Sequence, residues 1–219
     1  VEGTKITLSY ATAVGSLGLV GKVAIDTLKK DGVFSLLIRS IITSLIVFCY
    51  FEVLPHHPIG VSEVHLIMGS TLFLLFGLAP AVIGLAAGLL LQGVLFAPAD
   101  LPQYGINLTT LLVPLFAMSA LAKQIIPENT AYKDIQYRHA LALSTAYQGG
   151  IIAWVAFWAF YGQGFGAENV AQVASFGVAY MTVIIIEPFV DLAVLAIAKT
   201  ANQLQNSPLV EKRLYSTVG

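Results

Sequence analysis

Charged residues are scarce in this chain. Of its 219 residues only 11% are Asp, Glu, Lys or Arg, whereas 57% are hydrophobic. A soluble globular chain carries about 25% charged residues. The net charge is −1 and no basic tract occurs, so nothing in the sequence supports nucleic-acid binding. This composition is typical of a membrane protein, and the lipid bilayer is the first expected partner.

Cysteines and catalytic motifs are equally lacking. Cys49 is the single cysteine and lies in an apolar run, which excludes an internal disulfide. The chain has no HExxH metalloprotease motif, no GxSxG nucleophile elbow and no P-loop. Nucleotide hydrolysis through a P-loop is therefore excluded. We expect a protein that is not an enzyme and needs no organic cofactor.

Long apolar runs recur from one end of the chain to the other. Windows of about 20 apolar residues predict membrane-spanning helices. The predicted spans are 6–28, 33–54, 61–79, 80–98, 106–126, 140–161 and 169–198. We therefore predict an all-α fold, a polytopic transmembrane bundle of about seven helices. It should form a single integral membrane domain over residues 1–219.

Basic residues occur in alternate connections between these spans. Cytoplasmic loops of membrane proteins carry an excess of Lys and Arg. The connections around 55–60, 99–105 and 162–168 contain neither. The other three segments contain Lys29 and Lys30; Lys123, Lys133 and Arg138; and Lys199, Lys212 and Arg213. We therefore predict an N-terminus outside and a C-terminus in the cytoplasm.

Small residues line the first predicted span at Gly15, Gly18 and Gly21. Small residues let two membrane helices approach closely. Such a strip packs most often inside its own bundle. The alternative is a docking surface for another membrane subunit.

Three of the four histidines, His56, His57 and His65, cluster between two apolar runs. Ionisable groups at membrane depth often mark an ion or substrate pathway, and imidazole suits transition metals. One hypothesis is a metal site that opens at one face of the membrane. The other is a solvated turn with a capping histidine. Two imidazoles rarely make a tight site, so further ligands should come from residues 100–107 or from the segment around Glu2.

The residues around His65 suggest a local structure. Ser62 suits the N-cap of a helix over 61–79, with Glu63 in its first turn. His65 would then lie near the mouth of that helix. Elsewhere, we expect His139 to be solvated on the opposite face. Glu187 and Asp191, four residues apart, are expected to be solvated at a helix end, and the alternative is a proton relay.

Three segments resemble the CbiM/NikM proteins, the metal-binding membrane subunits of energy-coupling-factor cobalt and nickel transporters. Residues 60–69 resemble that family's Ser-x-x-His-Leu-x-x-Gly segment. Residues 91–96 are similar to its Leu-x-Gln-x-x-x-Phe, and residues 103–107 to its Leu-Gly-x-Asn. The resemblance implies that His65 is a ligand and that Asn107 lines the pocket. It also implies that a free N-terminal amine and a second-position histidine complete the site.

The chain departs from that pattern at its start, because Val1-Glu2-Gly3 contains no Met-His. These residues resemble those that follow Met-His in the family, so we expect a short preceding stretch. His56 and His57 are outside the family motif and could be extra capture ligands. Ser62 and Glu63 are expected to support the ligands.

The resemblance implies a substrate-specific subunit that binds and imports Co2+ or Ni2+ across the inner (cytoplasmic) membrane of the cell. Its partners would be a coupling transmembrane subunit, which could dock on Gly15, Gly18 and Gly21, and ATPase subunits that supply energy. Two alternatives remain. One is a non-transport accessory subunit of a larger membrane complex. The other is an intramembrane metalloenzyme, which would need a general base and an open metal position.

Overall fold

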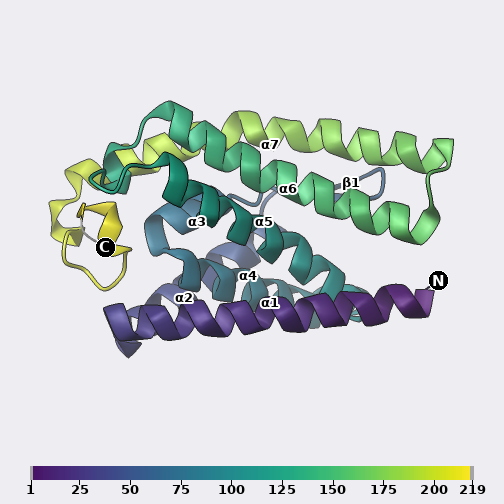
Figure 1. Cartoon of the computed structure of the whole chain (residues 1–219), viewed down its shortest axis with the longest axis horizontal. Helices are drawn as coiled ribbons and strands as arrows, with labels where there is room; N and C mark the ends of the chain where they lie inside the picture. The colour runs from purple at the N-terminus through teal and green to yellow at the C-terminus, as the bar shows by residue number, and fades with distance from the viewer. Residues whose placement is uncertain (1, 218–219) are drawn as a thin grey trace.

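The computed structural model describes residues 2–217 as a bundle of long helices that lie nearly side by side (Figure 1). The helices and strands are α1 (Glu2–Asp31), α2 (Val33–Glu52), β1 (His57–Ile59), β2 (Ser62–Val64), α3 (Gly69–Phe76), α4 (Leu78–Leu95), η1 (Pro98–Gln103), α5 (Tyr104–Ile125), η2 (Tyr132–Asp134), α6 (Tyr137–Gln163), α7 (Ala167–Thr200), η3 (Asn202–Leu204) and η4 (Lys212–Leu214). The predicted all-α bundle of about seven helices is confirmed.

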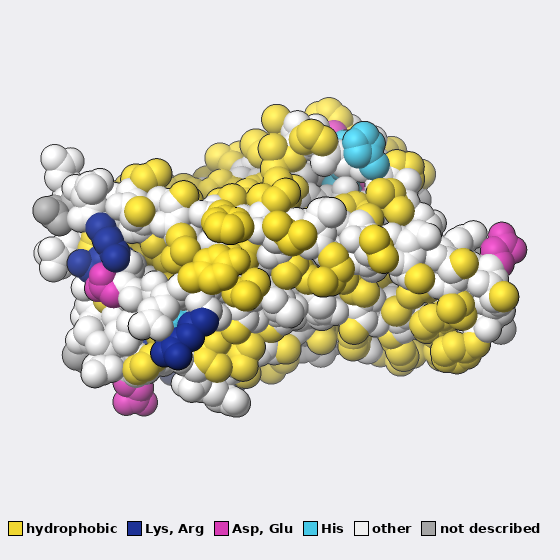
Figure 2. Space-filling model, turned by 90° about the horizontal axis from the view of Figure 1, so that it is seen from above, with side chains coloured by type: hydrophobic (Ala, Val, Ile, Leu, Met, Phe, Trp, Pro, Cys, Tyr) yellow, Lys and Arg dark blue, Asp and Glu magenta, His cyan; other side chains and the backbone are white. Residues whose placement is uncertain are grey.

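Six stretches of the described residues are long and apolar enough to cross a membrane: α1, α2, α4, η1 with α5, α6 and α7. Figure 2 shows hydrophobic side chains over most of one face, with Lys and Arg side chains gathered towards one end. This distribution fits a lipid-facing belt with polar ends. The protein is a multi-pass membrane protein.

The predicted helix over 61–79 is wrong. Residues 57–64 form an antiparallel hairpin in which His57 pairs with Val64. The helical part, α3, covers only Gly69–Phe76. Eight helical residues span about 12 Å, far less than the roughly 30 Å hydrocarbon core of a bilayer.

The chain nevertheless crosses the bundle a third time in this region. Gly60 lies against the backbone of Gln172 near the start of α7, and the Phe76 carbonyl accepts a hydrogen bond from Arg39 at the other end. An irregular segment and a half-length helix thus replace a full helix. The N-terminus and the hairpin consequently lie at one end of the bundle, called the hairpin end, and the C-terminus lies at the other (Figure 1).

Helices α2 and α4 pack closely through two glycines. A Cβ on Gly84 would clash with Thr43 Oγ1, and one on Gly88 would lie 2.7 Å from Val47 Cβ. The Thr43 hydroxyl uses this proximity to donate a hydrogen bond to the Pro80 carbonyl (2.7 Å). Close approach of small residues is a common way for membrane helices to associate.

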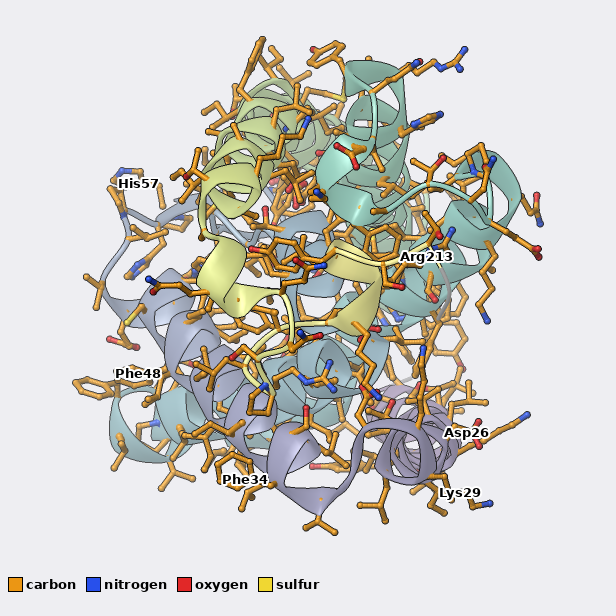
Figure 3. The ribbon with its side chains drawn as sticks, turned by 90° about the vertical axis from the view of Figure 1, so that its left-hand side faces the viewer. Asp26, Lys29, Phe34, Phe48, His57 and Arg213 are labelled. Atoms are coloured by element: carbon orange, nitrogen blue, oxygen red, sulfur yellow. The ribbon has the colours of Figure 1, made fainter. Side chains whose placement is uncertain are left out.

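The C-terminal end is closed by residues 207–215. The backbone N–H of Glu211 donates to the Leu75 carbonyl at the end of α3 (2.7 Å). Arg213 donates to the Pro127 carbonyl (3.1 Å) and lies over the ring of Tyr132. Figure 3, seen from this end, places Arg213 near the middle and Asp26 and Lys29 at the edge. The segment therefore ties α3 to the loop between α5 and α6.

Candidate functional site

A cavity of about 300 Å³ opens at the hairpin end. The hairpin, the segment before α3, and helices α1, α4, α5, α6 and α7 all contribute to its wall. Polar groups are frequent for a membrane bundle, and the lining includes Lys5, Ser62, Glu63, His65, Gln92, Asp100, Gln103, Asn107, Gln163 and Tyr180. Concave sites with a few converging polar groups are the usual places for ligands.

His65 lies in the irregular segment between β2 and α3, and its side chain is 13% exposed. The predicted helical position is wrong, because α3 begins only at Gly69. Ser62 consequently caps no helix but lies in β2 with Glu63. Both residues still line the cavity beside His65. Ser62, Glu63 and His65 thus share one wall of the cavity, in a backbone conformation that differs from the predicted helix.

The imidazole of His65 is held on two sides. Its ring lies edge-on to Phe51, with centroids 4.8 Å apart, and stacks on His56 at 5.2 Å. Its Nε2 lies 3.2 Å from Glu63 Oε2. Its Nδ1 is buried and has no hydrogen-bond partner among the described residues. A buried ring nitrogen with a free lone pair suits a metal ion.

The other two predicted histidine ligands differ in position. His56 is exposed but stacks on His65, and its Nδ1 lies 3.2 Å from the Leu54 carbonyl. His57 is exposed on β1 and points outward in Figure 3. The structure thus brings His56 to His65 and leaves His57 at the rim of the hairpin.

Asn107, on α5, is half-buried and lines the same cavity as His65. The loop proposed as a source of further ligands also reaches the cavity, through Asp100 and Gln103. Lys5 brings the first turns of α1 to the wall. Val1 itself lies outside the described residues.

The donor set within residues 2–217 is small. No group of three or more His, Cys, Asp or Glu side chains is placed there to hold a metal ion. His65 has His56 and Glu63 as neighbours, and together they do not form such a group. A tight transition-metal site needs additional ligands.

Two expectations about other polar residues are wrong. Glu187 and Asp191 are 0% and 1% exposed in the middle of the bundle, although we expected them to be solvated. His139 is also buried, and its Nδ1 accepts a hydrogen bond from the backbone N–H of Gln136 in a capping box at the start of α6. Carboxylates and amides within an apolar run were a signal that could have revealed the buried network, since polar groups in membrane helices usually face the interior.

The glycine strip of α1 lies on the outside of the bundle. Gly15, Gly18 and Gly21 are exposed, and an added Cβ would meet no atom within 4 Å. Of the two interpretations of this strip, internal packing is therefore excluded. A shallow apolar surface remains beside exposed Val14 and Leu17.

Comparison with known families gives one match. The family described as "CbiM: Cobalt uptake substrate-specific transmembrane region" matches residues 5–204. No curated protein and no solved structure matches the chain significantly. The matched region includes the cavity wall, the hairpin and all seven helices apart from the first residues of α1.

Proposed function

The chain belongs to the CbiM family of cobalt uptake substrate-specific transmembrane regions, and we propose that it captures Co2+ or Ni2+ in the cavity that contains His65. As a member of this family it is a transport component, and we infer that it has no enzymatic activity of its own. One observation carries the proposed site: a buried imidazole in a polar cavity, whose Nδ1 has no hydrogen-bond partner among the described residues.

The remaining ligands would come from the start of the protein. In the family pattern a free N-terminal amine and a second-position histidine complete the site, and Lys5 on α1 lines the cavity. His56 would capture the ion at the rim, with His57 outside it. Asn107, Ser62 and Glu63 would hold the ligands or bound water.

Transport would be energised by other subunits. The chain contains no P-loop, and ATPase partners would act through a coupling transmembrane subunit. The exposed surface at Gly15, Gly18 and Gly21 is the place proposed for that subunit. The protein would lie in the inner membrane with the hairpin end outside and the basic end in the cytoplasm.

Replacement of His65 tests the site. His65→Ala should abolish uptake of Co2+ or Ni2+ by cells without lowering the amount of protein in the membrane. A suitable control is His139→Gln, because Gln at this position can still accept from the N-cap backbone of α6. Normal uptake by His65→Ala, or equal losses in both variants, would contradict the proposed function.

A further inference from the structure

The segment that carries His65 is irregular although it lies inside a membrane bundle. Residues 65–68 form neither helix nor strand. Two tight turns occur there: Ile67 N–H donates to the His65 carbonyl (3.0 Å), and Gly69 N–H donates to the Ile67 carbonyl (3.1 Å). Non-helical backbone at membrane depth persists only where the protein satisfies its polar groups. The side chains that do so here control where His65 lies.

Gln148 on α6 provides the first of these contacts. Its Nε2 donates to the Ile67 carbonyl and to Glu187 Oε2, each at 2.8 Å. One amide group therefore uses both of its hydrogens, one on the irregular segment and one on α7. Gln148 is fully buried, so water does not replace either bond.

Glu187 provides the second contact directly. Its Oε1 accepts from the backbone N–H of Ser70 (3.0 Å), and its Oε2 accepts from Ser144 (2.6 Å) as well as from Gln148. Ser70 lies in the first turn of α3, whose N–H groups have no partner within the helix. A carboxylate at this position also complements the positive end of the helix. Glu187 thus fixes both sides of the junction between the irregular segment and α3.

We propose that Glu187, acting through Gln148 and the Ser70 amide, is a positioning residue that holds residues 65–70 so that His65 presents its ring nitrogen to the metal ion. This inference rests on the proposed function of His65. The tight fit of the junction supports it: a Cβ on Gly69 would clash with the Tyr147 ring, so the segment has little room to move. Groups that orient a metal ligand typically change metal affinity by about 10–100-fold when replaced.

The test uses Glu187→Gln and Gln148→Leu in the full chain, purified in detergent. Glu187→Gln places an amide donor where donors from Ser144 and Gln148 already point, and Gln148→Leu removes the donor to Ile67. Ser144→Ala is the matched control, because it removes one donor to Glu187 but no hydrogen bond to the segment itself. Co2+ affinity, the visible absorption spectrum of bound Co2+, thermal stability without metal, and amide hydrogen exchange of residues 65–70 are measured.

We expect both variants to bind Co2+ about 10–100-fold more weakly, to show an altered spectrum of the bound ion, and to exchange the amides of residues 65–70 faster. Ser144→Ala should resemble the wild type in all three. Lower thermal stability with an unchanged spectrum and unchanged exchange would show a purely structural role and overturn the proposal. Faster exchange with unchanged affinity would also overturn it, provided that His65→Ala abolishes binding. If His65→Ala binds Co2+ normally, the proposed function fails, and hydrogen exchange alone still decides whether Glu187 holds the segment.

Discussion

Arg39 on α2 and Glu211 near the C-terminus form an ion pair, with Arg39 Nη1 2.9 Å from Glu211 Oε2. The guanidinium is completely buried and also contacts Asp31 at the end of α1 and the Phe76 carbonyl at the end of α3. One arginine therefore joins α1, α2, α3 and the C-terminal segment. It lies beside a second cavity, of about 770 Å³, that is lined by Asp31, Gly77 and Glu211.

Removal of this arginine should strongly destabilise the protein. In Arg39→Met the side chain of Asp31, only 2% exposed, loses its buried partner and Glu211 loses an ion pair. Breaking a buried ion pair by removing one partner costs about 3–5 kcal/mol. Thermal unfolding in detergent should show a clear decrease in midpoint.

An exposed pair provides the control. Lys199 and Asp134 lie 3.4 Å apart with about half of each side chain exposed, and such pairs contribute only about 0–1 kcal/mol. Lys199→Met should therefore leave the midpoint nearly unchanged. Similar decreases in the two variants would show that the buried arginine contributes no more than a surface charge.

The glycines of α1 and those of α4 should respond differently to replacement by leucine. Gly18→Leu adds a side chain where no atom lies within 4 Å, so the isolated protein should keep its stability. If the coupling subunit docks there, co-purification with it should fall while metal binding persists. Gly84→Leu, by contrast, forces a clash with Thr43 and should destabilise the bundle itself. Unchanged co-purification of Gly18→Leu would exclude this surface from docking.

The long helices could be predicted from the sequence, because an apolar run of membrane length has few alternatives to a helix that satisfies its own backbone hydrogen bonds. The prediction of a full helix at the third crossing was wrong because an apolar sequence is equally compatible with an irregular backbone. What makes that backbone stable is a set of distant donors and acceptors, Gln148 and Glu187, that no local pattern reveals. The burial of Glu187 depends on the same long-range contacts, and this is why the expectation that it is solvated was wrong. Small residues occur on the surfaces of both α1 and α4, and only the fold shows that Gly84 and Gly88 face a neighbouring helix whereas Gly15, Gly18 and Gly21 do not.

The orientation of the protein can be tested by cysteine labelling. Gln103 is exposed at the end of η1 and lines the cavity at the hairpin end, whereas Lys133 lies in η2, beside the C-terminal segment that contains Tyr215. Because the chain crosses the bundle between them along α5, the two positions should face opposite sides of the membrane.

With exposed Cys49 first replaced by Ser, a membrane-impermeant thiol reagent added to intact cells should label Gln103→Cys. It should label Lys133→Cys only after the cells are opened. Labelling of both positions in intact cells would contradict the seven-crossing arrangement, and the reverse pattern would place the hairpin end in the cytoplasm.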